Sequence, residues 1–218
     1  MSRVLPILFN TEMVRAILDG RKTVTRRIIK QEKYLGVLQS PSRKRNPDIP
    51  DEYYIERLVK PQCEVGDVLY VRETWTKLYY VDPDGYTHYD QKMYFYAADG
   101  VPDISLVDAD GLEEDDQRIR WRPSIHMPKD AARIWLKVTD VRVERLQEID
   151  GRGILAEGIV NGKSNPANGK RWENMQRIAF SEVWNSTIMK ADRDRYGWNA
   201  NPWVWVIEFE RCGRPEEG

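Results

Sequence analysis

The stretch ILDGRKTVTRR, residues 17–27, runs from an apolar helix end through a glycine into a basic segment. Asn10 or Thr11 can cap the helix, and Gly20 can end it. The following residues, KTVTRRIIK, are typical of a strand. The stretch therefore predicts a helix, a turn and a strand, with cations and hydroxyls at the turn. Such a junction is either a solvated turn or a small site that attracts anions.

The chain has 218 residues, 41% of them hydrophobic and 11% aromatic, which is enough to bury a core in one domain. The start MSRVLPILFN lacks the pattern of a secretion signal, and no apolar run is long enough for a membrane span. We therefore expect a cytoplasmic protein without a membrane partner. Cys63 and Cys212 lie far apart, and no metal-ligand cluster accompanies His126, so we expect free thiols, no metal and no cofactor.

Charge is unevenly distributed although the formal net charge is only −1. Residues 21–60 hold eleven Lys or Arg against five Asp or Glu, which would attract nucleic acid or a nucleotide. Residues 99–118 hold eight acidic residues against one arginine, without the spacing of a calcium loop. We interpret the acidic segment as a solvated loop.

The order of the predicted elements favours a mixed α+β domain. Strands are expected in 66–75 and 132–146 and near the C-terminus in NPWVWVIEFER, and GRGILAEG predicts a short helix. A second helix is expected from the spacing of Trp172, Met175, Ala179 and Val183. Residues 34–62 are expected to be irregular. Strands and helices do not alternate regularly, and no GxGxxG or GxxxxGK motif is present, which argues against a doubly wound nucleotide-binding fold.

The strand in VLYVRETW places a carboxylate on its apolar side. Alternation puts Glu73 on the same face as Leu69 and Val71, whereas Arg72 faces the other way. A buried carboxylate is costly unless it is paired, so we expect a partner among Lys22, Arg26 and Arg27, in either a structural ion pair or a cleft. Arg72 is a candidate clamp for a phosphate or carboxylate.

Four blocks resemble the ASCH-domain family, in particular its longer phage and prophage branch. They are PILFNTEMVRAILDGRKTVTRRIIK, GDVLYVRETW, WRPSIHMPKDAARIWLKVTDVRVERLQEI followed by LAEGI, and YGWNANPWVWVIEFER, and they span nearly the whole chain. The resemblance implies a single domain over 1–218, built as a PUA-like curved β-barrel with flanking helices. Long insertions are then expected near 34–62, 99–118 and 160–171. The resemblance further implies RNA or nucleoside chemistry in a bacterial or phage-infected cell.

Small members of the family are amidohydrolases that remove the acetyl group of N4-acetylcytidine with a lysine, a threonine and a glutamate. On their G-R-K-T-x-T motif, Lys22 and Thr25 match directly, and the glutamate falls on Glu157 in LAEGI. A threonine needs an adjacent base to become a nucleophile, and a lysine acts as one only when its pKa is lowered. Arg21 and Arg26 are close enough in sequence to contribute to that lowering and to bind substrate.

Lys22 and Thr25 are an odd number of residues apart and would point to opposite faces of a regular strand. A shared site therefore requires irregular backbone, which a left-handed Gly20 would allow. Among the eight tryptophans, Trp75 and Trp198 are candidates for stacking on a base.

Three functions remain open: an amidohydrolase on a modified nucleoside, a module that binds RNA or single-stranded DNA without chemistry, and a phage accessory protein that binds a host protein. The first requires a compact Lys-Thr-Glu cluster, the second a continuous basic groove, and the third only an exposed patch.

Overall fold

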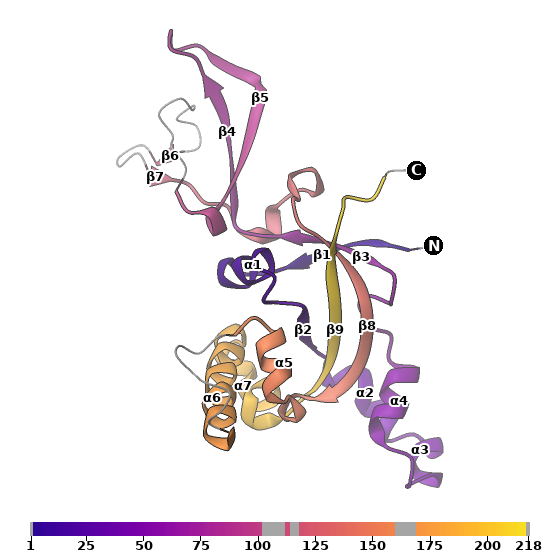
Figure 1. Cartoon of the computed structure of the whole chain (residues 1–218). Coiled ribbons are helices and arrows are strands. Elements are labelled where there is room, and N and C mark those ends of the chain that lie inside the picture. Colours follow the sequence, from indigo (N-terminus) through magenta and orange to yellow (C-terminus); the bar gives the residue numbers. More distant parts are fainter. Residues whose placement is uncertain (1, 102–111, 114–117, 160–168, 217–218) are drawn as a thin grey trace.

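A five-stranded sheet forms the centre of the molecule (Figure 1). The computed structural model describes residues 2–101, 112–113, 118–159 and 169–216. In spatial order the sheet strands are β1 (Val4–Leu8), β3 (Val68–Arg72), β8 (Trp135–Arg145), β9 (Trp203–Cys212) and β2 (Val24–Ile28). β1 and β3 are parallel, and the other neighbouring pairs are antiparallel.

The predicted strand near the C-terminus is confirmed as β9, and its apolar residues on both faces place it between two cores. Val204 and Val206 pack with the helices on one side, whereas Trp205 and Ile207 pack in the core on the other side. A strand that is buried on both faces needs apolar residues without alternation, which explains the run WVWVI.

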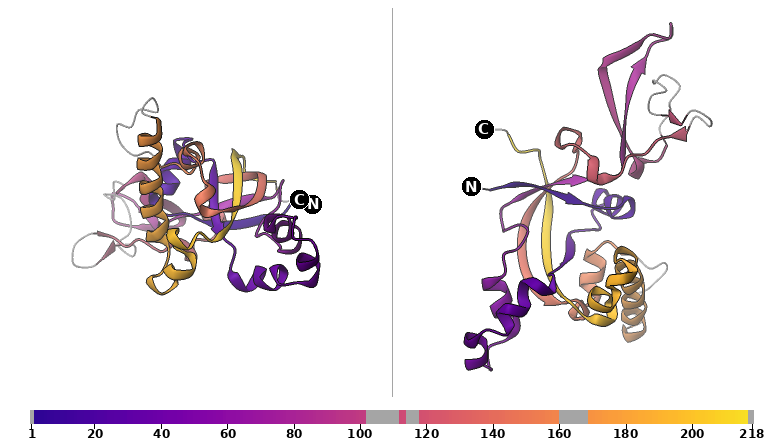
Figure 2. Two further views of the ribbon diagram at one scale, coloured as in Figure 1. Left: turned by 90° about the horizontal axis from the view of Figure 1, so that it is seen from below. Right: turned by 180° about the vertical axis from the view of Figure 1, so that it is seen from behind.

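Two groups of helices cover the two sides of this sheet (Figure 2). On one side lie α5 (Gly151–Ala156), α6 (Gly169–Thr187) and α7 (Arg193–Tyr196), and on the other lie α2 (Gln31–Leu38), α3 (Pro41–Arg45) and α4 (Asp51–Leu58). The expectation of an irregular 34–62 is therefore wrong. Ser40 caps α3 and accepts a hydrogen bond from the Arg43 N–H, while Pro41 and Pro50 stand where proline starts a helix rather than breaks one.

The buried face of α6 differs from the predicted one. The spacing indicated Trp172, Met175, Ala179 and Val183, whereas the structure buries Gln176, Phe180 and Trp184. Met175 is 42% exposed and Val183 36% exposed. The true face is shifted by about one residue along the helix, which brings two aromatic rings toward the sheet.

A two-stranded hairpin, β4 (Trp75–Val81) and β5 (Thr87–Tyr96), projects from the body of the molecule (Figure 1). The predicted acidic loop at 99–118 and the insertion at 160–171 fall largely outside the described residues. Of the former, β6 (Leu112–Glu113) pairs with β7 (Arg118–Ile119), and of the latter, the last three residues begin α6.

The α+β class is confirmed, whereas the closed barrel is not. β1 and β2 are the two edge strands of the sheet and do not pair with each other in the described part of the chain. The sheet is curved (Figure 1) but open.

Candidate active site

The predicted helix, turn and strand form one side of the site. Helix α1 (Thr11–Leu18) is capped by the Asn10 side chain, which accepts a hydrogen bond of 2.9 Å from the Met13 N–H. Gly20 is left-handed, with φ of 72°, as predicted. Lys22 then forms an isolated bridge with Glu157 before β2 begins. The backbone is therefore irregular where a shared site for Lys22 and Thr25 requires it.

Lys22 and Glu157 form a buried ion pair. The Lys22 Nζ lies 2.5 Å from Glu157 Oε2, and the exposed fractions of the two side chains are 0% and 7%. The same ammonium donates to the backbone carbonyls of Val24, at 2.8 Å, and Glu157, at 3.2 Å. All three ammonium hydrogens therefore have acceptors, none of which is Thr25.

The backbone after Glu157 can approach Lys22 only because the next residue is glycine. Gly158 has φ of 82°, and a Cβ there would lie 2.7 Å from the Ala16 Cβ and 2.9 Å from the Lys22 Cβ. A larger residue would push Glu157 and Lys22 apart.

Arg26 holds the other oxygen of Glu157. Its Nη1 lies 3.2 Å from Glu157 Oε1, and its Nη2 lies 3.1 Å from Glu144 Oε2. Arg142 in turn holds Glu144, at 2.7 Å. Both ends of the Arg26 guanidinium are thus occupied by carboxylates, which suits a residue that positions Glu157 rather than one that binds substrate directly.

Burial lowers the pKa of Lys22, since an ammonium without water is disfavoured. The negative charge of Glu157 opposes this shift, and the nearby Arg27 and Arg26 add to it. The expected contribution of Arg26 is therefore present, whereas Arg27 acts in place of the expected Arg21.

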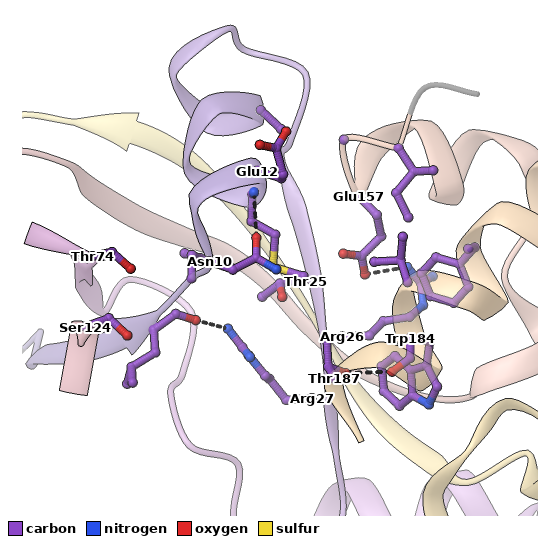
Figure 3. A pocket seen from close by; sticks show the side chains of 18 residues that line it. Asn10, Glu12, Thr25, Arg26, Arg27, Thr74, Ser124, Glu157, Trp184 and Thr187 are labelled. Atoms are coloured by element: carbon purple, nitrogen blue, oxygen red, sulfur yellow. Dashed lines mark hydrogen bonds and ion pairs between the residues drawn. The ribbon is translucent and has the colours of Figure 1, made fainter. Parts of the chain in front are cut away.

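Thr25 lines a cavity of about 400 Å³ between α1, β2 and α6 (Figure 3). Glu157 and Arg26 line the same cavity, whereas Lys22 lies behind Glu157 and does not. The hydroxyl of Thr25 makes no hydrogen bond with the described part of the chain. It is thus available to a ligand.

Several lining residues were not singled out by the sequence. They include polar residues around the cavity and aromatic residues of α6, namely Asn10, Thr74, Ser124, Phe180, Trp184 and Thr187. The rings of Phe180 and Trp184 stack with centroids 6.2 Å apart. These two residues form an aromatic part of the cavity wall, and the shifted face of α6 would have indicated them.

Glu73 is buried, as predicted, but its expected partners are wrong. It pairs with Arg133, whose Nε and Nη2 lie 2.9 Å and 3.0 Å from the two carboxylate oxygens. Arg133 also binds Asp99 and lies over the Tyr96 ring. Burial raises the pKa of Glu73, and Arg133 opposes that shift. Glu73 does not line the cavity and belongs to an ion-pair network at the base of the hairpin.

Four other predicted binding residues also lie outside the cavity lining. Arg21 is exposed and pairs with Asp19, and Arg72 donates to the Ile125 carbonyl. Trp75 is packed in a hydrophobic cluster beneath the hairpin, and Trp198 packs edge-on against Phe180. Trp184 therefore takes the place predicted for Trp75 and Trp198 in the wall of the cavity.

The described residues contain neither a metal-ligand cluster nor a membrane-spanning helix. No group of three or more His, Cys, Asp or Glu side chains there is placed to hold a metal ion. Among the helices of the same residues, none combines the length and apolarity that crossing a bilayer requires.

Comparison with known proteins gives one structural match. No family model matches the sequence, and no curated protein matches it either. The fold is similar to a solved structure described as the ASCH domain from Lactobacillus crispatus JV V101, with 12% identity and a TM-score of 0.35 over 96% of this chain and 79% of that chain. That domain bears the name of the family that the sequence motifs resemble.

Proposed function

We propose that the chain is a PUA-like ASCH-type domain that hydrolyses the amide of an N4-acylated cytidine. The observation that carries the proposal is the placement of Thr25 and Glu157 in the wall of one cavity, with Glu157 paired to the buried Lys22. The aromatic wall at Phe180 and Trp184 suits a nucleobase, because every base has a face that stacks on aromatic rings.

In the proposed reaction, the Thr25 hydroxyl oxygen attacks the carbonyl carbon of the acyl group. Its proton passes through the Glu157 carboxylate, which lines the cavity, to Lys22 behind it, and Lys22 accepts the proton when it is in its neutral form. The C–N bond then breaks, and the amino nitrogen of cytidine leaves with a proton relayed by Glu157. Water finally hydrolyses the acyl ester, releases the acid and restores Thr25.

The test is a screen of the purified protein against acylated nucleosides, with the Lys22→Ala variant as the control. The proposal predicts that the wild type releases acetate from N4-acetylcytidine and that the variant does not. If the wild type turns over no acylated nucleoside, the proposal is wrong.

A second candidate is a binding module without chemistry. The three fixed acceptors of the Lys22 ammonium favour it, because a fully hydrogen-bonded ammonium also suits a structural role. In this case the basic N-terminal segment binds RNA or single-stranded nucleic acid. Saturable RNA binding without turnover would distinguish this candidate from the enzyme. A role in binding a host protein has no described surface in its favour, because the acidic loop lies largely outside the described residues.

A further inference from the structure

Three cations lie in or directly behind the cavity wall, and carboxylates neutralise only two of them. Lys22 pairs with Glu157, and Arg26 pairs with both Glu157 and Glu144. Arg27 lines the cavity and forms no ion pair with the described part of the chain. An uncompensated positive charge therefore remains at Arg27.

The remaining carboxylate at the cavity does not cancel this charge. Glu12 also lines the cavity, but its side chain is 79% exposed and pairs with Arg15 at 2.7 Å. Solvent screens an exposed pair of this kind strongly. The guanidinium of Arg27 therefore gives the cavity a preference for negatively charged ligands.

Arg27 is held in place without using most of its donors. Its Nη2 donates to the Leu8 carbonyl at 2.8 Å, and its guanidinium lies 5.1 Å from the centroid of the Phe9 ring. Burial lowers the pKa of Arg27, but an arginine stays charged at neutral pH. The other N–H groups of the planar guanidinium have no acceptor in the described part of the chain, and they can donate to an anion.

Neutral donors line the same cavity (Figure 3). The hydroxyls of Thr74 and Ser124 make no hydrogen bond with the described residues. The Asn10 oxygen is occupied by its cap, so its NH₂ group remains as a donor. A fixed guanidinium with several hydroxyl and amide donors matches a phosphate group, which accepts hydrogen bonds on several oxygens at once.

We propose that this cavity binds a phosphorylated ligand, a nucleoside monophosphate, with its phosphate on Arg27 and its base against Phe180 and Trp184. The identity of the base rests on the proposed function, whereas the phosphate preference rests on Arg27 and the neutral donors. A cavity of about 400 Å³ has the size of a site for one small molecule. We therefore expect a single nucleotide rather than an RNA chain.

The test compares the binding of cytidine with that of its 5′- and 3′-monophosphates to the wild-type protein by titration calorimetry. We expect at least one monophosphate to bind about tenfold or more tightly than cytidine, as a charge-assisted hydrogen bond predicts. Arg27→Gln weakens the binding of the monophosphates more than that of cytidine and so removes this preference, and Arg27→Lys keeps part of it. Arg57→Gln, which removes an exposed arginine that lies over the ring of Tyr53 on α4, is the matched control and keeps the full preference.

Equal affinity of the wild type for cytidine and both monophosphates would overturn the inference without any variant. Equal weakening of all ligands in Arg27→Gln would overturn it as well, and so would tighter binding of a short RNA without terminal phosphates. These measurements need no turnover. Hydrolysis without a phosphate preference rejects this inference alone, and a phosphate preference without hydrolysis rejects the proposed function alone.

Discussion

The ammonium of Lys22 lies 2.5 Å from a carboxylate oxygen of Glu157, although 135 residues separate the two in sequence. The backbones of the same two residues form an isolated bridge. This contact joins the turn after α1 to the end of α5. It therefore fixes one wall of the cavity at the same point where the proposed proton transfer occurs.

Removal of one partner of this pair should destabilise the fold. In Lys22→Met, Glu157 keeps Arg26 but loses its closest cation, and breaking a buried ion pair costs about 3 kcal/mol or more. Urea unfolding measures this loss. The control is Glu12→Gln, which removes an exposed ion pair and should cost less than about 1 kcal/mol. Similar losses in the two variants would show that the Lys22–Glu157 pair does not stabilise the fold as described.

The lowered pKa of Lys22 predicts a pH dependence of stability. Between the lowered folded pKa and the unfolded value of 10.5, the unfolded chain binds more protons at this residue than the folded one does. The contribution of Lys22 to the free energy of unfolding therefore rises with pH in that window. Urea unfolding at several alkaline pH values should show a steeper rise for the wild type than for Lys22→Met. A steeper rise in the variant would mean that the pKa of Lys22 is raised instead.

Gly158 and Gly20 provide a matched pair of substitutions. Both have positive φ, so alanine is strained at either position, by about 1 kcal/mol or more. At Gly158 the new Cβ would also collide with Ala16 and Lys22, whereas at Gly20 it meets no atom within 4 Å. Gly158→Ala should therefore lower the free energy of unfolding by about 1 to 3 kcal/mol more than Gly20→Ala does. Equal losses would contradict the close approach at Gly158.

Much of the site's scaffold could be predicted because its signals are local. A capping residue, an apolar helix face and a terminal glycine predict α1, the left-handed Gly20 and the following strand from neighbouring residues alone. The candidate glutamate was placed by family resemblance, since no periodicity connects Glu157 with Lys22. The site's chemical roles stay predictions.

Other features depend on tertiary placement and could not be obtained from local patterns. Arg133 is 60 residues from Glu73, and nothing in the spacing of either residue indicates their pairing. Irregular structure was expected in 34–62, whereas Pro41 and Pro50 lie at the starts of two helices there. The aromatic residues of the cavity wall were not predicted, because the spacing indicated a face of α6 about one residue away from the one that is buried.

The basic N-terminal segment yields a prediction for the binding alternative. Arg43 pairs with Asp51, but Lys44 and Arg45 on α3 are exposed and form no ion pair with the described residues. If these cations contact RNA phosphates, affinity falls steeply with salt, and the Lys44→Ala/Arg45→Ala double variant shows a shallower slope. Fluorescence anisotropy with a labelled short RNA measures both slopes. A salt-independent affinity, or no binding at all, would remove the RNA-binding candidate.

The central claim, that Thr25 is the nucleophile, is tested most directly by the chemistry at its own hydroxyl. The measurement is a rapid-quench reaction of excess protein with N4-acetylcytidine, followed by peptide mass spectrometry of the segment that contains Thr25. The account predicts an acetyl ester on Thr25 in the wild type, with cytidine released at the same time. In Thr25→Ala it predicts neither the ester nor cytidine. Release of cytidine by Thr25→Ala at the wild-type rate would contradict the account.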